Sequence, residues 1–231
     1  MRLVRFALLL ALSLPALADD ACPLPGATGG PAALLGPYPP AGSPEAAADL
    51  AVVLWEQRTR TPEEVARAGS EEELSLEDFA GALAPGFEAG RHPRTEALLA
   101  RAARAARPCI GTVKRAYARE RPYVADARVA PAAERERTFS YPSGHATRGA
   151  LFAAVLAELA PARREALLRR GAQIGEDRVI AGVHYPSDVA AGQRLGAEIA
   201  KALLADRGFQ EALAEARALE WCGGAGAGAA R

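Results

Sequence analysis

The sequence predicts an all-α protein with a single domain. Segments rich in Ala, Leu, Glu and Arg, with apolar residues at helical spacing, follow one another along most of the 231 residues. Runs of Val, Ile, Thr and aromatic residues with alternating hydropathy, which would indicate strands, are almost absent. Half of the residues are hydrophobic and 24% are charged, a composition and length that suit one sizeable core. We therefore expect a helical bundle without a sheet.

The first 18 residues have the features of a secretory signal peptide. Arg2 and Arg5 precede the apolar stretch Phe6–Leu14, and an Ala-Leu-Ala cleavage signal ends at Ala18. A membrane anchor is the alternative, but the apolar stretch is too short to span a bilayer and Pro15 interrupts it. We predict cleavage after Ala18 and a periplasmic or secreted protein with no stable membrane anchor.

The rest of the chain divides into an arm, a domain and a tail. Residues 19–44 are rich in Pro and Gly, so we expect an extended arm in which helix cannot propagate. Residues 45–218 form the predicted domain, and the Gly/Ala-rich residues 219–231 form a flexible tail. Helical spacing predicts helices over Glu45–Arg58, Thr61–Ala68, Ser75–Leu83, Thr95–Ala106, Cys109–Ala118, Ala146–Leu159, Arg163–Ile174 and Ser187–Leu204.

Charge and cysteine content narrow the classes of partner. The 28 basic and 28 acidic side chains cancel, so the chain lacks the positive field that nonspecific nucleic-acid binding requires, and we expect no nucleic-acid partner.

Cys22, Cys109 and Cys222 allow one disulfide in an exported protein. Chain termini are often close together, which favours Cys22 with Cys222. No Cys/His spacing indicates a structural metal, and the oligomeric state, including a homo-oligomer, is left open.

Two cations stand at a helical spacing in the segment Lys-Arg-Ala-Tyr-Ala-Arg-Glu-Arg-Pro. Lys114 and Arg121 are seven residues apart, which on one helix is two turns, so both side chains can point the same way. Taken alone, such a segment is typical of a solvated basic helix face.

A second segment, Tyr-Pro-Ser-Gly-His, stands directly before a helical run. Its proline, followed by Ser143 and Gly144, presents free backbone N–H groups at a helix start, and such a start binds anions. A capped helix with an incidental His145 fits this segment equally well.

A third segment contains a histidine and a carboxylate one helical turn apart. His184 and Asp188 are separated by four residues, a spacing at which the acid can hold one ring nitrogen and leave the other as a nucleophile or base. A purely structural His/Asp pair is the simpler interpretation of this segment by itself. Arg178 precedes His184 and adds a further cation.

Together the three segments supply what phosphoryl transfer requires. Arginine forks and a lysine can hold the nonbridging oxygens, and backbone dipoles can stabilise the charge that spreads over them in the transition state. One histidine can attack phosphorus while the other protonates the leaving oxygen.

The order and spacing of these blocks resemble a known family signature. The first block is Lys, six residues, Arg-Pro; the second is Pro-Ser-Gly-His; the third is Arg, five residues, His, three residues, Asp. This arrangement is similar to the tripartite signature of the type 2 phosphatidic acid phosphatase superfamily, which vanadium haloperoxidases share. The details KRAYARERPY and YPSGHAT, together with the signal peptide and the arm, resemble the bacterial class A nonspecific acid phosphatases from Pro39 to about Leu204. The resemblance implies an all-α, single-domain helical bundle of the acid phosphatase/vanadium haloperoxidase type, exported and without a metal or other cofactor.

The resemblance also implies a role for each residue of the signature. His184 would be the nucleophile that forms a phosphohistidine, Asp188 would orient it, and His145 would be the general acid. The residues that would bind the phosphoryl group are Lys114, Arg121, Ser143, Gly144 and Arg178.

Some positions depart from the signature or lie outside it. The third block usually begins Ser-Arg, but here Asp177 precedes Arg178, and a carboxylate facing a phosphate would be repulsive. We expect Asp177 to turn away and pair with a neighbouring arginine; reduced phosphate affinity is the alternative. His92 matches no block and is predicted to be a surface or loop residue. The aromatic residues near the signature could line a pocket or belong to the core: Tyr117, Tyr123, Phe139 and Tyr141.

We therefore predict an exported, metal-independent acid phosphatase, a phosphoric monoester hydrolase that acts on small-molecule phosphate esters. Diphosphate or lipid-phosphate substrates are an alternative, because no residue identifies the leaving group. A noncatalytic periplasmic phosphate-binding protein is another, which Asp177 alone favours, and a vanadate-dependent haloperoxidase is a third. A histidine general acid should lose its proton, and the enzyme its activity, as the pH rises above neutrality.

Overall fold

The computed structural model describes residues 22–24, 30–71 and 73–221, and these residues form helices and connecting loops without a strand. The α-helices are α1 (Gly30–Leu35), α2 (Pro44–Thr59), α3 (Pro62–Ser70), α4 (Ala80–Leu83), α5 (Pro93–Tyr117), α6 (Pro122–Ala125), α7 (Gly144–Leu159), α8 (Arg164–Ile180), α9 (Pro186–Ala205) and α10 (Arg207–Ala216). Short 3₁₀ turns cover Glu77–Phe79, Ala89–Arg91 and Pro161–Arg163, and a π-helical turn covers Arg217–Trp221. The predicted all-α class is confirmed.

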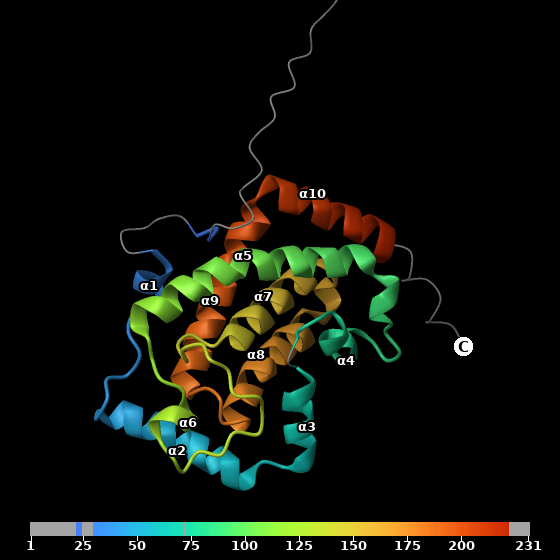
Figure 1. The fold of residues 1–231 in the computed structure, drawn as a ribbon. Coiled ribbons are helices and arrows are strands. Elements are labelled where there is room, and N and C mark those ends of the chain that lie inside the picture. The colour runs from blue at the N-terminus through green and yellow to red at the C-terminus, as the bar shows by residue number, and fades with distance from the viewer. Residues whose placement is uncertain (1–21, 25–29, 72, 222–231) are drawn as a thin grey trace, which may run out of the picture.

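Helix α7 lies at the centre of the bundle, between α8 and α9 (Figure 1). Its side chains are buried on most sides, including Leu151, Phe152 and Leu156. A Cβ atom at Gly149 would lie 2.7 Å from the carbonyl oxygen of Gly171, so glycine lets α7 and α8 approach backbone to backbone. Gly192 on α9 allows a similar approach to the start of α7, where the functional residues gather, since a Cβ atom there would lie 2.5 Å from the carbonyl oxygen of Ser143.

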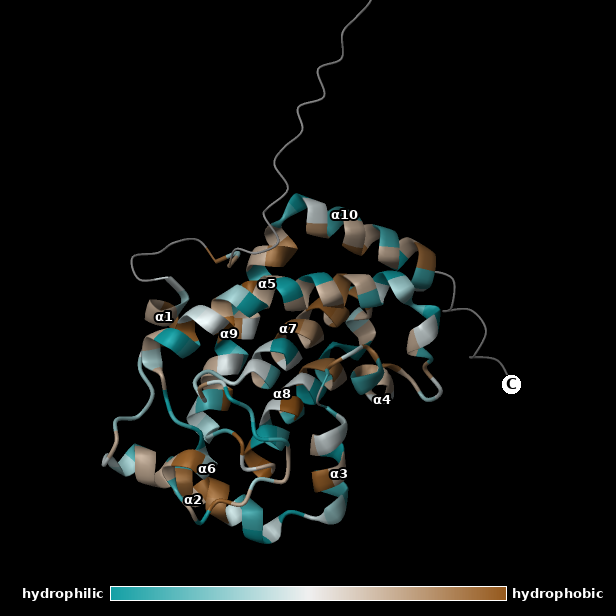
Figure 2. Cartoon of the chain, in the orientation of Figure 1, coloured by the Kyte–Doolittle hydropathy of each residue, from teal (hydrophilic) through white to brown (hydrophobic). Residues whose placement is uncertain are grey.

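Helices α5 and α10 cover one side of this centre (Figure 1). Their hydropathy is mixed along their length, as expected for helices with one buried and one solvated face (Figure 2). No helix in the described ranges is both long and apolar enough to cross a bilayer.

The predicted helices agree with the structure at α2, α3, α7 and α9 to within two residues at each end. The main difference is α5, a single helix of 25 residues where the sequence predicted two helices separated at Pro108. The proline removes one backbone hydrogen bond. The helix continues through it because Cys109, Ile110 and Val113 on the next turn are buried in the core.

Other segments differ from the prediction more strongly. The Ser75–Leu83 segment forms only a 3₁₀ turn and the four-residue α4, and α1 lies inside the arm where no helix was expected. Residues 219–221 were placed in the flexible tail, but they continue the last helical turn because Glu220 accepts a hydrogen bond from the Arg94 N–H at 2.6 Å. The signal peptide and residues 222–231 lie outside the described residues.

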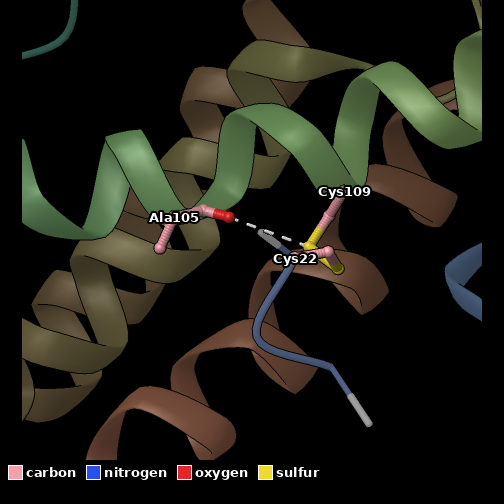
Figure 3. The surroundings of a disulfide bond; sticks show 3 residues. All are labelled: Cys22, Ala105 and Cys109. Atoms are coloured by element: carbon pink, nitrogen blue, oxygen red, sulfur yellow. Dashed lines mark hydrogen bonds between the residues drawn. A yellow bond between two sulfur atoms is a disulfide. The ribbon is translucent and has the colours of Figure 1, made fainter. Parts of the chain in front are cut away.

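The disulfide joins the arm to the middle of α5. Cys22 is bonded to Cys109, with a Cα–Cα distance of 4.9 Å (Figure 3). The predicted pairing of Cys22 with Cys222 is therefore wrong. Proximity of the termini does not decide the pairing, because the arm packs with Cys22 and Leu24 against the core cluster that contains Cys109.

Candidate active site

A cavity of about 1110 Å³ is lined by α5, the start of α7, the end of α8 and the loop between α6 and α7. Four of the predicted site residues line it: Lys114, Gly144, His145 and Arg178. Val183, which also lines the cavity, places the buried His184 directly behind its surface. Segments far apart in the sequence thus meet at one end of the bundle.

His184 is held in one orientation by Asp188, by Arg121 and by Ser140, whose Oγ atom lies 3.3 Å from Nδ1. Its Nδ1 atom lies 3.4 Å from Asp188 Oδ2, across the start of α9, as the four-residue spacing predicted. Its Nε2 atom lies 3.2 Å from Arg121 Nη1. Because the carboxylate can only accept a hydrogen bond, from Nδ1–H, and the guanidinium can only donate one, the lone pair of the imidazole is at Nε2.

Asp188 belongs to a buried network that the sequence analysis missed, here called the Asp188 network (Asp49, Arg119, Ser140 and Asp188). Ser140 Oγ donates to Asp188 Oδ2 at 2.6 Å, and Arg119 Nη1 donates to Asp188 Oδ1 at 2.7 Å. Arg119 also donates to Asp49 at 2.9 Å. Arg119 stands within the first block, so its position was visible in the sequence, but its partners come from α2 and α9 and only the fold reveals them.

Burial, and not the network, determines the charge of His184. Burial lowers the pKa of His184 to about 4, although the hydrogen bond with Asp188 acts in the opposite direction. Burial alone would raise the pKa of Asp188, but the His184 hydrogen bond and the Arg119 charge lower it. Above pH 4, His184 is therefore a neutral imidazole facing an ionised carboxylate.

The structure brings Lys114 and Arg121 together, but not on one helix face as the sequence predicted. Helix α5 ends at Tyr117, Ala118 takes the left-handed conformation with φ 46°, and Arg121 stands at the start of α6. The two residues are therefore not on one helix face. They meet at Thr138 Oγ1, to which Lys114 Nζ donates at 3.2 Å and Arg121 Nη2 at 3.0 Å.

Glu136 stands against these cations and was not predicted. Its Oε2 atom accepts from Arg121 Nη2 at 2.6 Å. Burial would raise its pKa, but the charges of Arg121 and Lys114 lower it to about 2. Burial, and then the Arg121 charge, lower the pKa of Lys114 to about 8. The carboxylate of Glu136 thus bonds to a cation of the site in the position that a bound anion could take.

The start of α7 is capped by Ser143, whose hydroxyl accepts from the Ala146 N–H. The Ser143 N–H is donated to the backbone oxygen of Asp188 at 3.0 Å, so this group is not the free donor that the sequence predicted. Gly144 and His145 line the cavity, and a Cβ atom at Gly144 would meet nothing within 4 Å. The open side of this helix start is therefore at Gly144 and His145.

Asp177 turns away from the cavity, as expected. It is fully buried and accepts from Arg67 through two bonds, of 2.9 Å from Nε and 2.6 Å from Nη2. The carboxylate is thereby neutralised by an arginine from α3 and does not face a bound anion.

Arg178 lines the cavity and is held from behind by Glu71, whose Oε2 atom lies 3.3 Å from Arg178 Nη2. Burial, and then the charge of Asp177, raise the pKa of Glu71 to about 7, against the effect of Arg170. The Nε atom of Arg178 is buried and has no hydrogen-bond partner among the described residues. We call these residues the Asp177 network: Arg67, Glu71, Arg170, Asp177 and Arg178.

The aromatic residues near the signature are mostly structural. Tyr117 and Tyr141 pack edge to face at 5.4 Å and bond through their hydroxyls to backbone oxygens of the arm. None of the four predicted aromatic residues lines the cavity, and Phe139 is 43% exposed. His92 precedes α5, in a loop as predicted, and stacks on Phe87.

The described part of the chain contains no group of three or more His, Cys, Asp or Glu residues arranged to hold a metal ion. The polar groups that line the cavity are mainly cationic, and an anion satisfies such groups. Arg178 Nε is a buried donor that a phosphate oxygen would satisfy.

Comparison with known proteins identifies the family. Residues 97–210 match the model of the PAP2 superfamily, the type 2 phosphatidic acid phosphatases. An acid phosphatase of Zymomonas mobilis is 32% identical over 195 residues, which cover 81% of this chain and 74% of that protein. The chain belongs to the PAP2 superfamily. The family resemblance of the three blocks is confirmed.

Other PAP2 relatives match over shorter segments. A non-specific acid phosphatase of Salmonella typhimurium is 42% identical over 110 residues, or 46% of this chain and 44% of that protein. A lipid A 1-phosphatase of Rhizobium johnstonii is 47% identical over 58 residues, or 25% of this chain and 24% of that protein. The match to the Salmonella protein thus spans less than half of its length.

Proposed function

We propose that this PAP2 protein is a metal-independent acid phosphatase, a phosphoric monoester hydrolase that works through a phosphohistidine at His184. The observation that supports it most directly is the orientation of His184: Asp188 holds Nδ1, and Nε2 faces Arg121 beside the cavity. An imidazole whose Nε2 lone pair faces the cations of a phosphate-binding site is suited to attack phosphorus.

In the first step, Nε2 of His184 attacks phosphorus, the N–P bond forms and the bond to the ester oxygen breaks. His145, which lines the same cavity, donates its proton to the departing oxygen, so the alcohol leaves neutral. The positive charge that develops on the imidazole is stabilised by Asp188 across the Nδ1–H hydrogen bond.

In the second step, water attacks the phosphohistidine. His145 takes a proton from the water, the P–N bond breaks, and His184 returns to the neutral form while inorganic phosphate leaves. Lys114, Arg121 and Arg178, with the N–H of Gly144, are the groups that hold the nonbridging oxygens in both steps. Binding of phosphate to Arg121 displaces Glu136 from Nη2.

We further propose that the protein is exported to the periplasm or secreted. The signal-peptide pattern of residues 1–18 supports this location, and so does the Cys22–Cys109 disulfide, because such bonds persist in oxidising compartments.

A lipid-phosphate or diphosphate substrate is the second candidate, favoured by the similarity of a short segment to a lipid A 1-phosphatase. The noncatalytic phosphate-binding alternative loses its only support, because Asp177 is paired with Arg67 and does not face the cavity.

Hydrolysis of p-nitrophenyl phosphate by the purified protein, with excess EDTA, tests the proposal between pH 4 and 9. We expect turnover that survives EDTA and declines at alkaline pH, and none in His184→Ala. Near-normal turnover in that variant would overturn the assignment. No hydrolysis by the parent protein would shift the proposal to lipid-phosphate or diphosphate substrates, assayed in the same buffers.

A further inference from the structure

The cavity is larger and more cationic than one phosphoryl group needs. Besides Lys114 and Arg178, four further arginines line it: Arg107, Arg135, Arg137 and Arg148. The carboxylates that face them are Glu134 and Glu136, and Glu136 is bonded to Arg121. The lining therefore has an excess of positive charge beyond the phosphate-binding set.

Two of these arginines, Arg107 and Arg148, stand on rigid helices. On α5, Arg107, Ile110, Gly111 and Lys114 line the cavity at the i, i+3, i+4 and i+7 spacing of one helix face. On α7, Arg148 follows Gly144 by one turn. Both arginines thus lie on the walls that lead away from the phosphate-binding end.

Arg107 and Arg148 are not paired directly with a carboxylate of the described residues. Among the described residues, neither forms a salt bridge or a side-chain hydrogen bond, whereas Arg67, Arg119 and Arg170 all do. Burial lowers the pKa of Arg148, Glu136 opposes that shift, and Arg107 and Arg178 add to it. Arginines that lie close together without a directly bonded carboxylate repel one another, and an anion that binds between them removes this repulsion.

We propose that Arg107 and Arg148 form a second anion subsite, which selects phosphate monoesters that carry a second phosphate group. This inference rests on the proposed phosphatase function and adds the class of substrate. The spacing follows from the helices: Arg148 is one turn from Gly144, about 6 Å along the axis, and Arg107 is two turns from Lys114, about 10 Å. The second phosphate binds on the order of 6 to 10 Å from the reacting phosphorus.

The gap between the two subsites is lined by small or apolar residues. Ile110 and Gly111 lie between Arg107 and Lys114 on the α5 wall, and both line the cavity. A short carbon chain fits this surface without leaving polar groups unpaired. The preferred class is therefore a soluble bisphosphate whose two groups are joined by a few carbon atoms.

The test compares 1,6-hexanediol bisphosphate with hexyl phosphate, which has the same chain and one phosphate. For the parent protein we expect kcat/KM to be at least about tenfold higher for the bisphosphate, well above the twofold statistical factor, because charge-assisted hydrogen bonds are the strong ones. In Arg148→Gln and Arg107→Gln the preference falls toward twofold, while kcat/KM for hexyl phosphate stays within about twofold of the parent. Arg104→Gln, an exposed arginine on α5 that does not line the cavity, is the matched control and keeps the preference.

The subsite is overturned if the parent shows no preference beyond twofold, if both variants keep it, or if Arg104→Gln loses it equally. Hydrolysis of p-nitrophenyl phosphate in the same preparations reports on the proposed function separately. If that activity is absent, calorimetry decides the subsite: affinity for the bisphosphate must exceed that for hexyl phosphate in the parent, and the excess must vanish in Arg148→Gln.

Discussion

Two buried charge networks lie behind the site, and they differ in how they are paired. In the Asp188 network, Arg119 Nη1 bonds to Asp188 at 2.7 Å and Nη2 to Asp49 at 2.9 Å, and Ser140 adds a hydroxyl. In the Asp177 network, two carboxylates, Glu71 and Asp177, lie beside each other, and burial, followed by the charge of Asp177, raises the pKa of Glu71 to about 7. The Nε atom of Arg178 has no partner there among the described residues.

The difference shows that the two networks have different effects on the residues they support. Burial keeps His184 neutral over the whole neutral range, and the ionised Asp188 holds it in one tautomer. The Asp177 network holds Arg178 with a carboxylate that titrates near neutrality and leaves one donor for a ligand. The first network therefore orients the nucleophile, and the second leaves an anion-binding group partly unsatisfied.

The largest effect is expected from Asp188→Asn. An amide can present an N–H to Nδ1, which favours the tautomer with the proton on Nε2 and removes the nucleophilic lone pair. We expect kcat to fall on the order of 10² to 10⁴-fold. Steady-state kinetics with p-nitrophenyl phosphate measures it. Asp49→Asn, one step further back, should cost much less; equal losses would show that Asp188 acts only as a structural residue.

The pH dependence of kcat/KM should separate the effects of His184 and Lys114. His184 has a pKa of about 4, so protonation removes the nucleophile below that value, and Lys114 has a pKa of about 8, so a phosphate-binding cation is lost above it. We expect kcat/KM to fall about tenfold per pH unit beyond each limit. Lys114→Arg should move the alkaline limb upward, because guanidinium stays protonated. An unchanged alkaline limb in that variant would assign it to another group.

The disulfide tests stability independently of the two networks. Cys22→Ser removes the link between the arm and α5, and we expect the free energy of unfolding to fall by about 2 to 4 kcal/mol. Chemical denaturation measures it. Activity at 25 °C should stay close to that of the parent, because neither bonded cysteine lines the cavity. Cys222→Ser is the control and should leave stability unchanged; a matching loss there would contradict the Cys22–Cys109 pairing.

The smallest effect concerns Glu71. Its pKa is raised from 4.5 to about 7 in the folded protein, so its contribution to stability is fully present below pH 4.5 and is lost as the pH rises to 7. Glu71→Gln imitates the protonated form and should remove this decline, worth at least about 3 °C in Tm across the interval. Thermal melts at several pH values measure it. The exposed Glu73→Gln is the control, and an identical decline in the parent and in Glu71→Gln would contradict the account.

Helical spacing in the sequence predicted the fold class, whereas the meeting of the three signature segments was implied by the family resemblance. Short motifs encode only local geometry directly. The four-residue spacing of His184 and Asp188 translates into a contact at the start of α9. Glu71 was missed because its partners, Arg170 and Arg178, are 99 and 107 residues away. Glu136 is 15 residues from Arg121, but no local pattern distinguishes it from a surface glutamate. The disulfide was mispredicted because the packing of the arm on α5 is a tertiary property.

The central claim is that His184 Nε2 accepts the phosphoryl group. Rapid quenching of the protein with a ³²P-labelled monoester, under alkaline conditions that preserve phosphohistidine, followed by peptide mapping, tests it most directly. We predict label on the peptide that contains His184, formed within one turnover and lost in His184→Ala. Label on another residue, or steady turnover with no labelled protein at any quench time, would contradict it.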